Sequence, residues 1–285
     1  DQVKAQGLWA LFLDEELGGP GYGQLKLGLL NEILGRYGSA PQIFGAAAPD
    51  TGNMEMLAAY GTEEQKKRWL EPMLNQEIWS AYSMTEPQGG SDPKLFKTYA
   101  ERDGDEWVIN GQKVWTSGAH FCDYGILLTR TDPNVPKHKG LTMFWIDMKD
   151  PAVEVRPIKQ MSGGSEFNEV FFTNLRVKDS QRLGKPGDGW KVALTTLMNE
   201  RLAVGGSQGN ADTDDLIELA RDTTIAGEPA IRHGGVRERI ADWYVQAQGL
   251  KFTRFRTLTA LAKGETAGPE ASMPKNGAAK KMKDR

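Results

Sequence analysis

The chain has 285 residues, of which 39% are hydrophobic and 26% charged, a composition typical of a globular protein of two or three packed units. Its 35 basic and 38 acidic residues give a net charge of −3, which argues against a nucleic-acid-binding surface. Its one cysteine, Cys122, excludes an internal disulfide and a zinc site built on cysteines, and no apolar run reaches the ~20 residues that a membrane span needs.

The first third, residues 1–79, is predicted to be helical. Apolar residues at helical spacing occur in 8–15 and again in 25–37, and glycines follow both stretches. Thr62 and Gln65 have the spacing of a capping box, which predicts a helix from there through Leu70. Because the chain does not begin with methionine and its last residues start a helical pattern that stops, we expect a piece of a longer polypeptide.

The middle third, residues 80–187, has the composition of strands. β-rich runs occupy 98–101, 107–109, 125–131, 141–148, 153–158 and 169–177, separated by glycine, proline, asparagine and aspartate, with a turn expected at Gly104 between the first two. Asn110-Gly111 is a strong short hairpin signal, so we expect a tight turn there. Several short strands at regular spacing predict a sandwich or small barrel.

Helices return in the last third, residues 188–285. They begin near Trp190, and residues 236–261 form a long amphipathic pattern without an interior proline. Helices, then strands, then helices predict an α+β protein of several domains, with separate α and β layers. We place the domain boundaries at 79 and 187.

Three polar stretches have the residue types of a binding site. In 82–91 (YSMTEPQGGS), accessible backbone amides and hydroxyls can bond the edge of a flat heteroaromatic ring and a pyrophosphate; alternatively the stretch only turns the chain. In 113–118 (KVWTSG), a tryptophan can lie along a ring face while hydroxyls reach its edge; alternatively it is a core tryptophan at a strand end.

The third stretch is Asn199-Glu200-Arg201. Glu200 follows several apolar residues of its helix, and apolar surroundings raise the pKa of a carboxyl group, which suits a general base near neutral pH. The alternative is an ordinary glutamate–arginine pair on a helix surface. The glycine-rich 18–23 and 184–189 lack the spacing of a phosphate loop, and the three histidines do not have the spacing of a metal site, so we expect no metal.

In this order, the three stretches resemble the acyl-CoA dehydrogenase family of flavoproteins. YSMTEPQGGSD (82–92) resembles its Y-x-x-T-E-P-x-x-G-S-D signature, 108–131 resembles its N-G-x-K-x-W segment, and 187–202 resembles the entry to its C-terminal domain. The resemblance implies an N-terminal helical domain, a middle β-barrel and a C-terminal helical bundle. It also implies FAD between the last two domains, across a subunit boundary of a tetramer.

The resemblance also implies roles for individual residues. Those implied to contact FAD are Tyr82, Met84, Thr85, Gly90, Ser91, Trp115, Thr116, Ser117 and Arg221. Trp115 would pack beside the isoalloxazine, Ser117 would give its hydroxyl to flavin N5, and Arg221 would reach the pyrophosphate of a neighbouring subunit. Ser91 and Arg201 would border the acyl-CoA substrate, and Glu200 would be the catalytic base, unless the base lies beyond residue 285.

The implied activity is the dehydrogenation of an acyl-CoA to a trans-2-enoyl-CoA. Electron-transfer flavoprotein is the expected acceptor, and the expected assembly is a homo-oligomer, a dimer or tetramer, or a heteromer. The expected location is the bacterial cytoplasm, with the mitochondrial matrix as the alternative. Two other functions stay open: a non-catalytic partner subunit of a heteromeric dehydrogenase, and an acyl-CoA oxidase.

Overall fold

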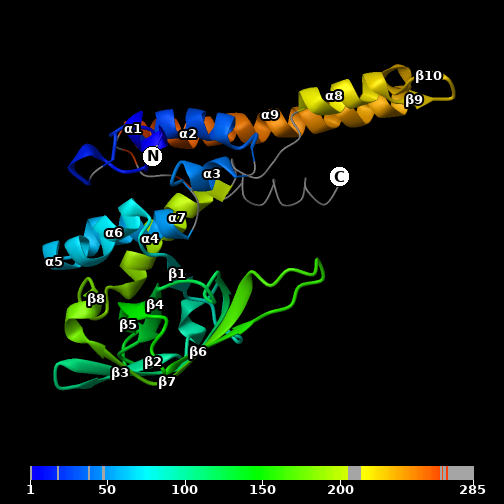
Figure 1. Ribbon diagram of the computed structural model, residues 1–285. Coiled ribbons are helices and arrows are strands. Elements are labelled where there is room, and N and C mark those ends of the chain that lie inside the picture. The colour runs from blue at the N-terminus through cyan, green and yellow to red at the C-terminus, as the bar shows by residue number, and fades with distance from the viewer. Residues whose placement is uncertain are drawn as a thin grey trace. The chain divides into compact units, whose positions relative to one another are not determined.

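The computed structural model describes residues 2–17, 19–37, 39–46, 49–204 and 213–263, together with 265 and 268. The chain divides into two units, one of Ala47–Met198 and one of Asp1–Ala46 with Asn199–Arg285; the elements of both are drawn in Figure 1. This division by contacts groups residues differently from the predicted boundaries at 79 and 187, which stay predictions.

The Ala47–Met198 unit is built on one eight-stranded sheet (Figure 1). The strand order is β6-β7-β3-β2-β4-β5-β8, and β1 pairs in parallel with β4. The strands are β1 (Ser80–Ser83), β2 (Tyr99–Asp103), β3 (Glu106–Ser117), β4 (Tyr124–Arg130), β5 (Leu141–Asp147), β6 (Val153–Pro157), β7 (Phe167–Lys178) and β8 (Arg182–Leu183). Short 3-10 turns, η3 (Pro93–Leu95), η4 (Lys137–Gly140) and η5 (Asp179–Gln181), connect some of them.

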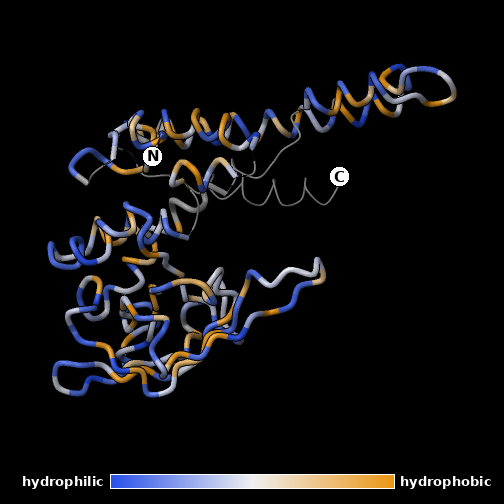
Figure 2. Tube along the Cα trace, viewed as in Figure 1, coloured by the Kyte–Doolittle hydropathy of each residue, from blue (hydrophilic) through white to orange (hydrophobic). Residues whose placement is uncertain are grey.

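The sheet curls around a shared core. Trp107 on β3 and Phe144 on β5 have ring centroids 5.4 Å apart, although two strands separate β3 from β5 in the sheet order. Val170 and Phe172 of β7 belong to the same buried cluster. Figure 2 shows hydrophobic stretches along these strands and a hydrophilic turn between β2 and β3. The predicted sheet-rich middle region is therefore confirmed.

The hairpin predicted at Asn110-Gly111 is wrong. The turn between β2 and β3 lies at Gly104, and Asn110 and Gly111 lie within β3, where its register with β7 shifts. Asn110 exchanges two hydrogen bonds with Asn174 of β7. At Gly111, φ is +147°, and a Cβ would lie 2.6 Å from the Cα of Thr98. Glycine is needed here because another backbone approaches closely, and not because the chain turns.

Short helices of the same unit pack on the sheet: α4 (Asp50–Tyr60), α5 (Glu63–Gln65), the π turn η2 (Lys66–Leu70) and α6 (Glu71–Asn75). The predicted capping box is confirmed, since the Thr62 hydroxyl accepts from the Gln65 amide and the Gln65 side chain accepts from the Thr62 amide. Gln65 also donates to the carbonyls of Ser180 and Arg182, which ties the helix to the start of β8.

The other unit is mainly helical. Its elements are α1 (Gln2–Ala5), η1 (Glu15–Leu17), α2 (Gly23–Leu34), α3 (Ala40–Ile43), α8 (Thr213–Asp222), β9 (Thr224–Ile225), β10 (Glu228–Pro229), η6 (Ala230–Arg232) and α9 (Gly234–Ala262). Helix α7 (Gly189–Val204) contains the residues where the two units divide. An ion pair of 3.3 Å joins Glu32 of α2 to Lys251 of α9. Among the described helices, none has the length and apolar character that crossing a membrane requires.

Candidate functional site

The loop after β1 lies against the end of β3, so the first two polar stretches come together. The Val114 amide donates to the Thr85 carbonyl at 2.8 Å, and Lys113 Nζ donates to the Met84 carbonyl at 2.9 Å. The hydroxyls of Ser83 and Thr116 are 3.3 Å apart. Residues 29 to 33 positions apart in sequence thereby form one polar edge.

Trp115 lies in a β-bulge at this edge. Lys113 pairs with Val170 and Thr116 with Asn168, so β3 has one residue more than β7 across the same interval. Trp115 has φ +62°, a left-handed conformation that costs an L-residue about 1–2 kcal/mol. Its side chain is 55% exposed, and its ring meets Phe167 edge-on at 6.1 Å. The bulge therefore holds a large aromatic ring partly in the open, at a cost in backbone strain.

The two hydroxyls after Trp115 have different surroundings. Thr116 is 1% exposed, and its hydroxyl lies against Ser83 in the interior. Its carbonyl accepts a hydrogen bond from Asn168 at 2.9 Å. Ser117, in contrast, is half-buried at the end of β3. Of the two, Ser117 is the hydroxyl better placed to meet a ligand.

The loop after β1 contains half-buried, buried and exposed residues. Tyr82, Met84 and Thr85 are half-buried, and the Tyr82 hydroxyl donates to the Met84 sulfur at 3.3 Å. Gly90 and Ser91 are exposed, and a Cβ on Gly90 would meet only the Thr85 methyl group, at 3.9 Å. The backbone around Gly90 therefore has open space beside it.

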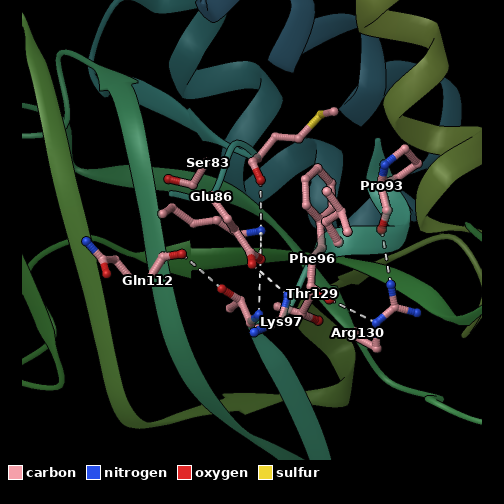
Figure 3. A network of polar contacts seen from close by, with 12 residues as sticks. Ser83, Glu86, Pro93, Phe96, Lys97, Gln112, Thr129 and Arg130 are labelled. Carbon is pink, nitrogen blue, oxygen red and sulfur yellow. Dashed lines mark hydrogen bonds and ion pairs between the residues drawn. The ribbon is translucent and has the colours of Figure 1, made fainter. Parts of the chain in front are cut away.

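A buried ion pair, which the sequence reasoning did not single out, lies beneath this edge; Figure 3 shows Glu86 within the network of polar contacts. The side chains of Lys113 and Glu86 are 0% and 1% exposed, and Lys113 Nζ is 2.8 Å from Glu86 Oε1. The Glu86 carboxylate also accepts from the amides of Lys97, at 2.6 Å, and Thr98, at 3.0 Å, and from the Gln88 side chain. Glu86 lies within the stretch 82–91 and Lys113 within 113–118, so their places in these two motifs were the only sequence signal that pointed to the pair.

The surroundings of the pair shift both pKa values downwards. Burial lowers the pKa of Lys113 to about 8, although the attraction of Glu86 opposes the change and the nearby Arg130 adds to it. Burial by itself raises the pKa of Glu86, but the charge of Lys113 and the hydrogen bonds from Lys113, Lys97 and Thr98 together outweigh it, so this pKa lies below its ordinary value. At neutral pH both groups are therefore charged.

The remaining predicted residues belong to the other unit. Arg221 is exposed in the last turn of α8. Glu200 and Arg201 lie in α7, but their side chains fall outside the described residues. Within the part of the chain that the structure describes, no three histidine, cysteine or acidic side chains are grouped as a metal site requires.

Comparison with known proteins matches most of the chain. Residues 1–77, 81–175 and 187–284 match the N-terminal, middle and C-terminal domain models of acyl-CoA dehydrogenases. The relative acyl-CoA dehydrogenase IpdE1 of Mycobacterium tuberculosis is 36% identical over 96% of this chain and 68% of its own length. IpdE1 of Mycolicibacterium smegmatis is 38% identical over 73% of this chain and 55% of its own.

A solved structure, the Tcur3481-Tcur3483 steroid ACAD, has a TM-score of 0.84 at 29% identity. The match covers 98% of this chain and 71% of that one. This chain thus spans between about half and about two thirds of the length of the two curated relatives.

Proposed function

The chain belongs to the acyl-CoA dehydrogenase family, an oxidoreductase family, and we propose that it catalyses the FAD-dependent dehydrogenation of an acyl-CoA to a trans-2-enoyl-CoA. The observation that carries this proposal is the edge where the loop after β1 joins β3. There Trp115, which is strained and partly exposed, lies at the same end of β3 as the half-buried Ser117, and the backbone of Thr85 lies beside them.

The chemistry of these groups fits FAD. The indole of Trp115 offers a flat apolar face for the isoalloxazine, and the hydroxyls of Ser117 and Thr85 can bond its polar edge. The open backbone at Gly90 and the exposed Ser91 hydroxyl suit a pyrophosphate. When bound, FAD would supply the acceptor for the hydride that leaves the β-carbon of the substrate.

The other roles fall to residues of the chain itself. Glu200 would take the α-proton on its carboxylate, and the electron pair of that C–H bond would form the Cα=Cβ double bond. Ser91 and Arg201 would lie along the acyl-CoA, and Arg221 would contact the pyrophosphate of FAD in a neighbouring subunit. These assignments rest on the positions of the residues in the family's motifs.

Substrate, acceptor and assembly belong to the same proposal. The similarity to a steroid ACAD adds steroid side-chain thioesters to the straight and branched acyl-CoA substrates worth testing. That protein's name contains two designations. A heteromer of two different chains is therefore an arrangement to test beside a homodimer or homotetramer. Electron-transfer flavoprotein is the proposed acceptor.

The test of the proposed base is the reduction of bound flavin by acyl-CoA under anaerobic conditions. Glu200→Gln should slow this step by about 10²-fold or more, because a positioned general base contributes that much. The control Glu218→Gln alters an exposed glutamate of α8 and should leave the rate unchanged. If the Glu200 variant reacts within about a factor of two of the wild type, Glu200 is not the base.

A further inference from the structure

The loop that carries the first motif is closed at its base by one side chain. The Glu86 carboxylate accepts hydrogen bonds from the amides of Lys97 and Thr98, which follow it by 11 and 12 residues. The two ends of the segment 87–96 are therefore held together at the Glu86 carboxylate. We call this closure, formed by Glu86, Lys97 and Thr98, the loop neck. Gly90 and Ser91, the exposed residues proposed to meet FAD, lie within this closed segment.

Lys113 joins the loop neck to β3. Its ammonium donates to the Glu86 carboxylate and to the Met84 carbonyl, and it lies 4.7 Å from the centre of the Phe96 ring. One side chain thus contacts both the outgoing and the returning parts of the loop. Lys113 precedes the strained Trp115 by two residues in the same strand, so the residue that binds the loop also belongs to the bulged part of β3.

The charge of Glu86 is needed for this arrangement. Its two oxygens accept from Lys113, Lys97, Thr98 and Gln88, and a carboxylate can accept at all of these positions. A glutamine in the same place would turn an N–H group towards some of these donors. A buried donor left without an acceptor is destabilising, so the neck would open there.

We propose that Glu86 and Lys113 act as a positioning pair, which holds the loop of residues 87–96 against the bulge of Trp115 so that FAD meets a preformed wall. This inference rests on the proposed function. Neither side chain would touch the cofactor, since both side chains are buried. Their effect is therefore on the affinity for FAD, through the geometry of the loop.

The experiment uses Glu86→Gln, Lys113→Met and the double variant. For each we measure the Kd of FAD, amide hydrogen exchange at Lys97 and Thr98 without FAD, and the free energy of unfolding. Each single change should weaken FAD binding and speed exchange at the neck by about tenfold or more, because hydrogen bonds to a buried charge are lost. The control pair, Glu154→Gln with Arg156→Met, removes an exposed ion pair of β6 and should change each quantity by less than about twofold.

The double variant separates positioning from stability. Replacing both charges removes the isolated buried charge, so the free energy of unfolding should recover relative to the single variants. The Lys97 amide still lacks its carboxylate, so fast exchange at the neck and weak FAD binding should persist. If exchange and FAD affinity recover together with stability, or if Glu86→Gln leaves both within about twofold, the positioning role is refuted.

The outcomes also separate this inference from the proposed function. If the wild type binds no FAD while exchange at the neck responds as predicted, the flavin proposal fails and the structural clamp stands. If the wild type binds and reduces FAD but exchange at the neck does not respond to either substitution, the positioning pair fails and the proposed function stands.

Discussion

The strain at Trp115 gives a prediction whose sign is unusual. In ordinary strand positions, alanine is more stable than glycine by roughly 0.5–1 kcal/mol, because glycine loses more backbone freedom on folding. Trp115 has φ +62°, where every residue with a Cβ is strained and glycine is not. We therefore compare Trp115→Ala with Trp115→Gly, since both remove the indole and differ only in the presence of a Cβ.

The expected difference follows from two opposing effects. Relief of the left-handed strain favours the glycine variant by about 1–2 kcal/mol, and the entropy of its unfolded chain disfavours it by roughly 0.5–1 kcal/mol. Trp115→Gly should therefore be more stable than Trp115→Ala by about 0.5–1 kcal/mol. Both variants should bind FAD more weakly than the wild type, because the proposed face contact is gone.

The assay is urea unfolding without FAD, with Glu101 as the matched control. Glu101 is an exposed residue of β2 and is not among the residues with positive φ, so Glu101→Gly should be less stable than Glu101→Ala. The order of stability should thus be reversed between the two positions. If alanine is the more stable residue at both positions by the same margin, no strain is stored at the bulge.

Two further predictions concern the sheet itself. Gly111→Ala should cost about 3 kcal/mol of unfolding free energy, because its Cβ would meet the backbone of Thr98. Gly104 has φ +65° and nothing within 4 Å of an added Cβ, so Gly104→Ala should cost about 1 kcal/mol. Equal costs in urea unfolding would contradict the close approach at Gly111. The pKa of Asp179 is lowered from 3.8 to about 2, chiefly by its hydrogen bonds with Arg182, so its stabilising effect is present above pH 3.8 and is lost as the pH falls towards 2. Asp179→Asn should therefore cost about 1–2 kcal/mol at pH 6 and almost nothing near pH 2, and a cost that does not change with pH in acid unfolding would refute this assignment.

Local signals in the sequence predicted much of the fold. The capping box of Thr62 and Gln65 was predicted correctly, because its partners lie three residues apart and need nothing from the rest of the chain. Asn110-Gly111 was read wrongly for the opposite reason. A glycine that permits a turn and a glycine that permits a second backbone to approach look alike in sequence, and the approaching Thr98 belongs to another segment.

The candidate site was predicted as separate motifs, and the structure adds how they join. A glutamate within a proline- and glycine-rich loop is expected to be exposed, and a lysine in a strand beside a turn signal likewise. Glu86 and Lys113 are buried instead because each has the other as its counter-ion across 27 residues, which no local spacing reveals. The roles of Glu200, Arg201 and Arg221 stay predictions.

The central claim is that this chain forms a flavin site which oxidises an acyl thioester. The most direct test is to load the protein with FAD and add straight-chain, branched and steroid side-chain acyl-CoA compounds without oxygen. We predict that at least one of them bleaches the yellow absorption of oxidised flavin and yields the trans-2-enoyl-CoA. Retention of bound, fully oxidised flavin with every one of these thioesters would contradict the account.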